Sequence, residues 1–374
     1  MKSIKVTHIT NVEVDNYFLN NLCDFNSRDE IEFSAVTFAP RAGFTEGMEK
    51  RGVCAYALDA MNRKLYPKAI KELWKILKKE NPDIVHLHLF DPTLIGLILA
   101  KMQKRKTVLT RHHSDALYKI SSKFKRGFYL QIERFINARV NHIVAPSEMV
   151  RDILVERENV PREKVSVIPY GQITERFDHI TKHKIEKVRE ELGIGEGDLT
   201  LVCNSRLYHQ KGHVYLFEAL APLVKANPKV KLYLVGKGDF QPQLEELVEK
   251  HQIKENVYFL GWRDDALEIM ANADIIVHPS LEDALSSAVI ESLMLERPVI
   301  ATDISGVRDS LDDGKYGMIV PPKDVDAFRR ALEKMLENLD EYRLRAKEGR
   351  KHIIRYMSAE RVAEEYKEIY QKLL

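Results

Sequence analysis

Short apolar runs alternate with amphipathic stretches along the first half of the chain. The runs that predict strands are 4–10, 31–38, 83–89, 107–113, 142–147 and 165–171. Apolar positions with helical periodicity lie between them, at 16–25, 64–79, 93–102 and 123–140. Ser147 is a suitable N-cap for one more helix. Such strand–helix alternation predicts a parallel sheet with helices on both faces.

The second half repeats this pattern. Its expected strands are 199–206, 230–238, 257–262, 274–280, 298–303 and 317–322, and its clearest expected helices are 324–336 and 355–374. The segment 169–178 contains Pro and Gly and has no periodicity, so it is the expected linker. We therefore expect an α/β fold with two doubly wound, Rossmann-like domains, at 1–171 and 172–355, and a terminal helix at 356–374. Ligands bind at the carboxyl ends of such strands, so a central cleft between the two domains is the expected site.

The composition excludes several classes of protein. The 374 residues include 58 Lys and Arg against 56 Asp and Glu, which gives a formal charge of +2, and 44% are hydrophobic. This balance argues against global disorder and against nucleic acid as a partner. The three distant cysteines predict neither a disulfide framework nor a CxxC metal site. The longest apolar run, 94–100, is much shorter than the ~20 residues of a membrane span, and no signal-peptide pattern is present. We expect a cytoplasmic protein, at most attached to the inner face of a membrane.

Two cations follow the first expected strand of the second half. Arg206 and Lys211 are five residues apart, just before a glycine and a helix start. A planar guanidinium and a mobile ammonium at a strand's carboxyl end suit a diphosphate, and two solvated surface charges are the alternative. Gly236 and Gly238 follow the next strand and permit close approach of a ligand. The third glycine of a dinucleotide fingerprint is missing, so a simple tight turn is the alternative there.

An acidic pair lies around another helix start. Asp283 is in the loop after an expected strand, and Glu291 is inside the helix that we expect to begin at Ser286 or Ser287. The free amides at a helix start attract an anion, and Glu291 is close enough to accept hydrogen bonds from hydroxyls of the same ligand. These features together describe a nucleotide-sugar site. A capped helix with an incidental acidic pair is the alternative.

Five segments of the second half resemble the donor domain of the retaining GT-B glycosyltransferases of family 4. They are RLYHQKG, LYLVGKGDF, VYFLGW, PSLEDALSSAVIESLMLERPVIAT and SGVRDSLDDGKYGMIVPPKD, in that order. In the first half, DIVHLH, TRHH, IVAPSEMVRDIL and EKVSVIPYG resemble the acceptor domain of the same family. The resemblance covers almost the whole chain. It implies that a sugar, of the hexose type, moves from a nucleoside diphosphate sugar to a hydroxyl acceptor with retention of configuration.

The resemblance also implies residue roles. Arg206 and Lys211 would hold the diphosphate, Glu291 the ribose hydroxyls and Asp283 the hydroxyls of the donor sugar. The other implied donor contacts are the backbone at Leu285, Ser286 and Ser287, and the segment at Trp262 and Arg263 beside the base. His112 matches the family histidine at the reaction centre, with His113 as its alternative. The candidate catalytic residues are therefore His112, Asp283 and Glu291.

Three positions depart from the family pattern. Asp283 stands where Glu is usual and is shorter by one C–C bond, about 1.5 Å, which predicts a changed sugar contact. The loop at 10–16 has no glycine, so Glu13, Asp15 and Asn16 would face the cleft on the acceptor side. Tyr170 stands where Asn is common, and we interpret it as a change in packing.

The implied mechanism is retaining transfer. The cationic pair and the helix amides would stabilise the departing nucleoside diphosphate, whose oxygen would help to deprotonate the incoming hydroxyl. No DxD motif is placed to hold a metal on the phosphates, so neither metal nor cofactor is expected. By analogy with the family, the acceptor is a glycan or lipid-linked glycan in the synthesis of a cell-envelope polysaccharide or glycolipid. The terminal helix is implied to return to the first domain, and a simple second-domain helix is the alternative.

The stretch 101–139 is strongly basic, with eleven Lys or Arg against two acidic residues. Its residues Phe124, Phe128, Ile132, Phe135 and Ile136 can share one helix face. Such a helix can lie on an anionic membrane surface, although an aromatic face turned to the core is the simpler interpretation. An anionic acceptor would also explain the charge. His86 and His88 alternate within an apolar strand and are interpreted as buried histidines rather than metal ligands.

Two other functions share the expected architecture. A nucleotide-sugar epimerase would release no acceptor product, and a non-catalytic nucleotide-sugar-binding scaffold would explain Asp283. A dinucleotide-dependent dehydrogenase is disfavoured because GxGxxG is missing from both halves. A solute-binding protein is disfavoured because no export signal is found.

Overall fold

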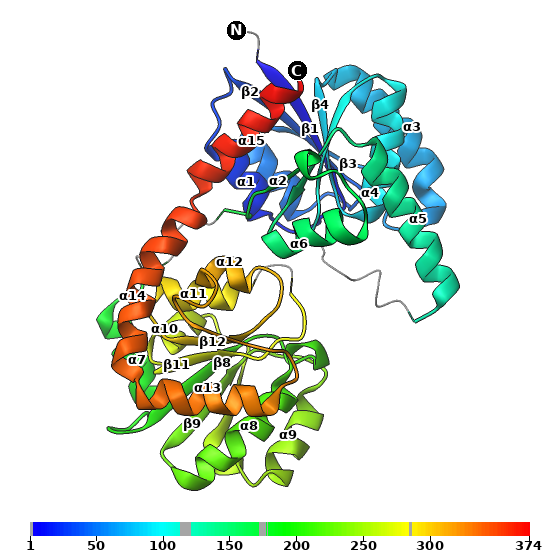
Figure 1. Ribbon diagram of the computed structural model, residues 1–374. Coiled ribbons are helices and arrows are strands. Elements are labelled where there is room, and N and C mark those ends of the chain that lie inside the picture. The colour runs from blue at the N-terminus through cyan, green and yellow to red at the C-terminus, as the bar shows by residue number, and fades with distance from the viewer. Residues whose placement is uncertain (1–2, 113–120, 172–176, 178, 284–285) are drawn as a thin grey trace. The chain divides into compact units, whose positions relative to one another are not determined.

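The computed structural model describes residues 3–112, 121–171, 177, 179–283 and 286–374. It divides into two compact units, one formed by Met1–Ile173 with Met357–Leu374 and the other by Thr174–Tyr356 (Figure 1). Each unit contains a parallel sheet with helices against its faces, and the expected α/β fold with two doubly wound sheets is confirmed. Among the described residues, no helix combines the length and the apolarity needed to cross a bilayer.

The first unit has a seven-stranded sheet in the order β3-β2-β1-β4-β5-β6-β7. Its strands are β1 (Ile4–Thr10), β2 (Ile31–Thr37), β3 (Cys54–Ala57), β4 (Ile84–His88), β5 (Lys106–Thr110), β6 (His142–Ala145) and β7 (Val165–Val167). Its helices are α1 (Tyr17–Asp24), α2 (Gly43–Lys50), α3 (Tyr66–Glu80), α4 (Phe90–Met102), α5 (Lys123–Arg139), α6 (Glu148–Asp152) and α15 (Ala359–Leu373). The strand order reverses between β1 and β4, which makes the carboxyl ends of these strands the switch point where ligands bind in such sheets.

The second unit has a six-stranded sheet in the order β10-β9-β8-β11-β12-β13. Its strands are β8 (Leu199–Asn204), β9 (Val230–Val235), β10 (Val257–Gly261), β11 (Ile275–His278), β12 (Val299–Thr302) and β13 (Met318–Val320). Its helices are α7 (Lys182–Glu191), α8 (His213–Ala226), α9 (Gln241–Lys250), α10 (Ala266–Ala271), α11 (Ser287–Met294), α12 (Val307–Leu311), α13 (Val325–Glu337) and α14 (Leu339–Tyr356). The order reverses between β8 and β11.

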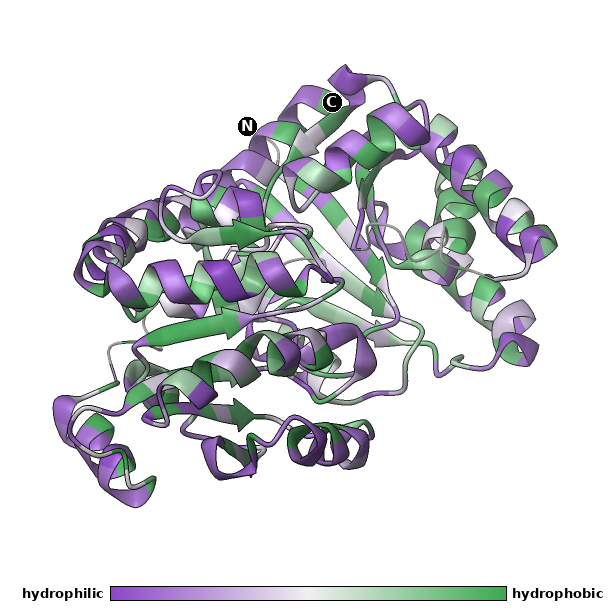
Figure 2. Ribbon diagram, turned by 60° about the horizontal axis from the view of Figure 1, so that its bottom comes forward, coloured by the Kyte–Doolittle hydropathy of each residue, from purple (hydrophilic) through white to green (hydrophobic). Residues whose placement is uncertain are grey.

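Hydrophobic patterning explains these elements. The central strands are apolar along most of their length because helices cover both faces, whereas the helices alternate polar and apolar residues (Figure 2). In α3, for example, Ala69, Leu73 and Leu77 are buried at intervals of one helical turn. Asn81 ends this helix in the left-handed conformation, with φ of 48°, which asparagine tolerates well.

Two details differ from the expected pattern. The pair α2 and β3 was not expected, because α2 contains two glycines and β3 is a four-residue edge strand. The expected helix at 355–374 was wrong at its start, since the chain forms two helices that are interrupted at Met357 and Ser358. Ser358 caps α15 by accepting a hydrogen bond from the Arg361 amide at 3.2 Å.

Helix α15 belongs to the first unit although it ends the chain. Its buried residues Val362, Tyr366 and Tyr370 pack in one hydrophobic cluster with Phe18 and Leu22 of α1. Their contacts with α1 make the terminal helix part of the first unit's core. Tyr366 and Tyr370 also form hydrogen bonds inside the sheet, with Thr110 Oγ1 at 3.1 Å and with His86 Nδ1 at 2.7 Å.

Candidate functional site

A pocket of about 640 Å³ lies at the carboxyl ends of β8, β9 and β11 in the second unit. The structure brings together here most of the residues expected at a donor site: Arg206, Lys211, Gly236, Trp262, Asp283, Ser286, Ser287 and Glu291. They meet because parallel strands end at the same edge of a sheet, next to the point at which strand order reverses.

Glycines bring the loops of this pocket close together. A Cβ added at Gly236, where φ is +142°, would lie 2.1 Å from the Ser205 carbonyl oxygen. A Cβ at Gly212, where φ is +68°, would lie 2.0 Å from the Pro279 carbonyl oxygen. Both positions therefore require glycine to let the loops after β8, β9 and β11 touch. The same contact places Lys211, next to Gly212, against the loop after β11.

An ion pair occupies the centre of the pocket. The Lys211 Nζ lies 2.7 Å from Asp283 Oδ2, and the two side chains are only 11% and 27% exposed. The sequence predicts separate roles for these residues, one on phosphate and one on a sugar hydroxyl. The structure places both groups at one point, where a ligand with an anion beside a hydroxyl can contact both.

His278 also lines the pocket, although the sequence suggests only a buried strand histidine. Its Nε2 lies 2.9 Å from Ser286 Oγ and 3.9 Å from Asp283 Oδ2. Burial, together with the nearby Lys211 charge, lowers the pKa of His278 to about 4, so the ring is neutral at physiological pH. Ser286 is the N-cap of α11 but makes no side-chain cap, because its hydroxyl faces His278. The first amides of α11 are thus left without a serine cap.

Glu291 lies in α11 and is only 8% exposed. Its Oε2 accepts a hydrogen bond from Asn204 Nδ2 at 3.3 Å. Asn204 was missed in the sequence because it falls inside the expected strand 199–206. Its position as the last residue of β8, the strand at the switch point, is the signal that could have found it.

The remaining donor predictions have different outcomes. Trp262 lines the pocket and is 64% exposed. A second pocket of about 620 Å³ lies beside Gly238 and Gly261, with Tyr208 and Phe259 in its lining. Arg263 does not line either of these pockets. Its guanidinium pairs instead with Asp265 and Glu191, each at 2.7 Å. Leu285 lies outside the described residues.

His112 follows β5 in the first unit and is half-buried. Its Nε2 lies 3.0 Å from His88 Nδ1, and its Nδ1 lies 3.1 Å from Tyr170 Oη. The Tyr170 ring also stacks on the His112 ring, with centroids 5.5 Å apart and planes inclined by 17°. Our interpretation of Tyr170 as a change in packing was therefore incomplete, because it is also a hydrogen-bond partner of a candidate catalytic residue. His113 lies outside the described residues.

The glycine-free loop after β1 makes local contacts. Asp15 Oδ1 accepts from Asn20 Nδ2 at 2.9 Å, and Asn16 caps α1 by accepting from the Leu19 amide at 3.0 Å. A Cβ at Gly47 of α2 would lie 2.3 Å from Asp15 Oδ1, so a glycine outside the loop makes room for it. Asp15 and Asn16 thus have structural partners, whereas Glu13 is exposed. Their contact with an acceptor stays a prediction.

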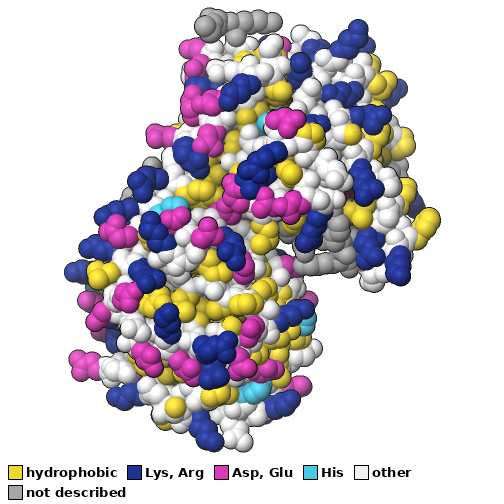
Figure 3. Space-filling view, in the orientation of Figure 1, with side chains coloured by type: hydrophobic (Ala, Val, Ile, Leu, Met, Phe, Trp, Pro, Cys, Tyr) yellow, Lys and Arg dark blue, Asp and Glu magenta, His cyan; other side chains and the backbone are white. Residues whose placement is uncertain are grey.

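The apolar face expected on α5 divides: Ile132 and Ile136 pack in the core, whereas the phenylalanines do not, so the simpler expectation is wrong for the aromatic residues. Phe124, Phe128 and Phe135 are 86%, 60% and 37% exposed. The buried face carries Ile136 and a polar cluster instead, because Glu133 of α5 pairs beneath the helix with buried Arg111. Arg111 also pairs with Glu158 at 2.8 Å. Glu133 thus lies on the buried face of α5, and the three phenylalanines lie on its exposed face. Apolar and cationic side chains lie together over α5 at the right of Figure 3.

Two parallel sheets of Rossmann type, the second with a cationic and acidic pocket at its switch point, are the architecture of the GT-B fold. The sequence matches the family "Glycosyl transferases group 1" over residues 184–352 and "Glycosyltransferase Family 4" over residues 21–176. "Putative glycosyltransferase EpsD" of Bacillus subtilis (strain 168) is 30% identical over 310 residues, which cover 80% of this chain and 79% of the relative. The chain belongs to the group 1 glycosyltransferases and is a transferase.

Two further comparisons agree. An Escherichia coli relative, UDP-Gal:alpha-D-GlcNAc-diphosphoundecaprenol alpha-1,3-galactosyltransferase, is 27% identical over 276 residues, which cover 72% of this chain and 70% of the relative. The crystal structure of Anabaena Alr3699/HepE in complex with UDP is similar in fold, with a TM-score of 0.84 and 18% identity over 99% of this chain and 100% of that chain.

Proposed function

We propose that this protein transfers a hexose from a UDP-sugar to a hydroxyl of a glycan or lipid-linked glycan, with retention of configuration and without a metal ion. The observation that carries the proposal is the pocket at β8, β9 and β11, where three cations, two carboxylates and a helix N-terminus converge. UDP is favoured as the nucleotide because the Escherichia coli relative is named for UDP-Gal and the Anabaena neighbour contains UDP.

The diphosphate is proposed to bind between Arg206, Lys211 and the first turn of α11. These groups supply positive charge where negative charge develops on the leaving nucleoside diphosphate, which is the largest contribution in many enzymes. The amides of α11 add the positive end of a helix dipole. Because Arg206 and Lys211 provide full charges, the phosphates need no metal for neutralisation.

The ion pair between Lys211 and Asp283 suggests how the donor is selected. A phosphate oxygen would approach Lys211, and a sugar hydroxyl would replace part of the contact that Asp283 makes with Lys211. Asp283 is shorter than the usual Glu, and its contact with Lys211 sets its position in the pocket. A nucleoside diphosphate without a sugar would offer a phosphate oxygen to Lys211 but no hydroxyl to Asp283.

The nucleoside is proposed to lie at the other side of the same pocket. Glu291, oriented by Asn204, would accept hydrogen bonds from the ribose hydroxyls. The base would lie beside Trp262 and the glycines after β9 and β10, where backbone groups are accessible. Arg263 would contribute only through its backbone, because its side chain is engaged with Asp265 and Glu191.

The anomeric configuration is retained if the acceptor hydroxyl attacks the same face of the donor sugar from which the nucleoside diphosphate departs. The departing phosphate oxygen would accept the proton of the incoming hydroxyl as the new glycosidic bond forms. The resemblance implies a role for His112 at this reaction centre, and we propose that it contacts the donor sugar.

Calorimetric titration with UDP, GDP, ADP, CDP and TDP, each with and without EDTA, tests the donor site. We expect selective binding of UDP that EDTA does not change. NMR of the product formed from a matching UDP-sugar should show the donor's anomeric configuration. Failure of all five nucleotides to bind would contradict the proposed donor site, an inverted product would contradict retention, and loss of binding in EDTA would contradict metal independence.

We also propose that α5 attaches the protein to an anionic membrane surface, where lipid-linked acceptors are found. Phe124, Phe128 and Phe135 fall within about 40° of one another around the helix axis at 100° per residue. Lys123 and Arg134 lie on one side of this stripe, and Lys125 and Arg139 lie on the other. The acidic Glu133 is on the opposite, buried face. An apolar stripe between rows of cations is typical of helices that lie in the interfacial region of a bilayer.

The double variant Phe124→Ser/Phe128→Ser should weaken binding to phosphatidylglycerol-containing vesicles by about a hundredfold or more in a cosedimentation titration, because two phenylalanines inserted in the bilayer contribute roughly 1.5–3 kcal/mol each. Leu344→Ser on α14, where Leu344 is 67% exposed, is the matched control and should bind like the wild type. Neutral phosphatidylcholine vesicles and high salt should both weaken binding. Equal binding by the double variant and the wild type would contradict the assignment to α5.

A further inference from the structure

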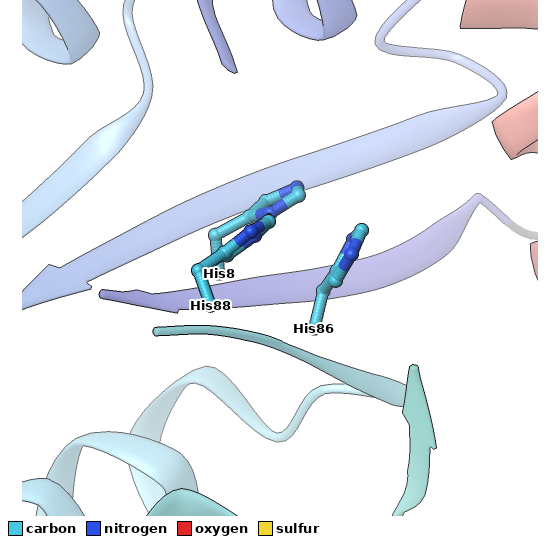
Figure 4. Close-up of side chains that lie close together, drawn as sticks. All are labelled: His8, His86 and His88. Atoms are coloured by element: carbon cyan, nitrogen blue, oxygen red, sulfur yellow. The ribbon is translucent and has the colours of Figure 1, made fainter. Parts of the chain in front are cut away.

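Three histidines lie together in the interior of the first unit. His8 is on β1, and His86 and His88 are on β4 (Figure 4). The parallel register pairs His8 with His86, and His88 lies two residues further on the same face of the sheet. Each of the three side chains is no more than 3% exposed. The proposed function uses none of them.

Hydrogen bonds connect two of these histidines to His112. His8 Nδ1 lies 2.9 Å from His88 Nε2, and His88 Nδ1 lies 3.0 Å from His112 Nε2. His112 Nδ1 then lies 3.1 Å from Tyr170 Oη. These contacts form one chain from the centre of the sheet to the end of β5. Both ring nitrogens of His112 are therefore engaged by the protein itself.

The arrangement fits hydrogen bonding better than a metal site. The rings of His86 and His88 stack with centroids 4.4 Å apart, and those of His8 and His88 stack at 5.2 Å. Histidines that bind one ion point a nitrogen at a common centre instead of lying face to face. His86 also has partners for both nitrogens, since Nδ1 lies 2.7 Å from Tyr370 Oη and Nε2 lies 2.8 Å from Thr110 Oγ1.

The three hydrogen bonds that link His8 to Tyr170 all have the same donor-to-acceptor direction. Burial lowers the pKa of His8 to about 3 and that of His88 well below its ordinary value, so both rings are neutral and each carries one N–H. His8 Nε2 is buried and has no hydrogen-bond partner within the described part of the chain. An unpaired buried N–H is less tolerable than an unpaired lone pair. His8 therefore donates to His88, His88 donates to His112, and His112 donates to Tyr170.

The backbone next to the chain is held in an unusual conformation. Leu89, directly after His88, has φ of 65° and ψ of 166°, a region that residues other than glycine rarely adopt. Such strain persists only where surrounding structure imposes it, and it clusters at functional sites. It marks the end of β4, and hence the position of His88, as a tightly constrained part of the fold.

We propose that His88, oriented by His8, and Tyr170 are positioning residues that hold His112 in the Nδ1–H tautomer with its ring plane fixed. This inference rests on the proposed function, because it assumes that His112 contacts the donor sugar. A histidine ring with both nitrogens hydrogen-bonded to the protein can hold a fixed position against the sugar, but it does not act as a general base. The proton of the acceptor hydroxyl then goes to the departing phosphate, in agreement with the retaining mechanism proposed above.

The tautomer can be measured without substrate. In the full chain labelled with ¹⁵N-histidine, NMR should show His112 with a protonated Nδ1 and an unprotonated Nε2. In Tyr170→Phe the Nδ1–H loses its acceptor, and the His112 Nδ1 signal should shift while His88 keeps Nε2 unprotonated. A protonated Nε2 on His112 in the wild type would overturn the proposal, as would unchanged signals in Tyr170→Phe.

Kinetics separate positioning from folding. His88→Leu removes the donor to His112 and should lower kcat about ten- to hundredfold, with little change in donor KM, because misplacement of a contact near the reacting atoms has effects of this size. His88→Asn keeps an N–H near the position of Nδ1 and should recover most of kcat. Equal losses in the Asn and Leu variants would overturn the proposal.

Two controls keep the outcomes distinct. His88→Leu can be replaced by Tyr170→Phe if it does not fold, because Tyr170 is half-buried and lies at the other end of the hydrogen-bonded chain. The NMR signals of His112 in Tyr170→Phe then test the proposal. Zinc and EDTA should leave the wild-type signals of His8, His86 and His88 unchanged, and a zinc-induced shift of these three would overturn the hydrogen-bonded arrangement. UDP binding and wild-type transfer test the proposed function itself, whereas the tautomer of His112 is read in the ligand-free protein.

Discussion

Lys211→Met should weaken UDP binding by about 1.5–3 kcal/mol, roughly ten- to hundredfold, as measured by calorimetry. Methionine preserves the length and much of the apolar stem of lysine but removes its charge. Two effects act in the same direction, because the phosphate loses a cation and Asp283 loses the partner that lies 2.7 Å from it. The Asp283 carboxylate, no longer paired with Lys211, would then repel the incoming diphosphate.

A double-mutant cycle separates these effects. Asp283→Asn added to Lys211→Met should recover part of the lost affinity, because it removes the repulsion but not the missing attraction. Arg206→Ala should weaken binding by a similar amount. Lys254→Met is a matched control, since Lys254 is an exposed lysine of the same unit that pairs with Glu249. Unchanged affinity in both Arg206→Ala and Lys211→Met would show that the diphosphate binds elsewhere.

Lowering the pH from 7 to 5 should destabilise the protein strongly. Burial lowers the pKa of His8 and His213 to about 3 and that of His278 to about 4. In the unfolded chain these rings titrate near 6.5, so between pH 6.5 and the lowered values the unfolded state binds more protons. The stabilising contribution is complete above pH 6.5 and is lost as the pH falls. At pH 5 the loss amounts to about 2 kcal/mol for each such histidine, because pH 5 lies about 1.5 pH units below the unfolded pKa and each unit corresponds to about 1.36 kcal/mol.

Urea unfolding followed by circular dichroism at pH 7, 6 and 5 measures this dependence. His8→Phe removes one titrating group and should make the stability of the first unit less sensitive to pH. His183→Gln is the control, because His183 is an exposed histidine. Parallel pH dependences in the wild type and His8→Phe would mean that His8 is not the buried neutral ring that the structure describes.

The fold was largely predictable from local patterns. Apolar runs such as 4–10 and 142–147 correspond to β1 and β6, because a strand covered on both faces must be apolar. The failures also have local causes. The glycines of α2 conceal a helix whose stability comes from packing, and the break at Ser358 interrupts two amphipathic stretches without an obvious change in periodicity.

The amino-acid sequence by itself determined the parallel architecture, the family and most of the residues that line the pocket at β8, β9 and β11, since strand ends and family motifs are encoded in contiguous segments. Only the tertiary structure decided which of these groups touch. Lys211 and Asp283 are 72 positions apart, and His8 and His88 are 80 apart. Such contacts depend on strand order and register, and on glycines that let distant loops approach. Tyr170 shows the same limit, because a local pattern identifies an aromatic residue but not the histidine nitrogen that its hydroxyl reaches.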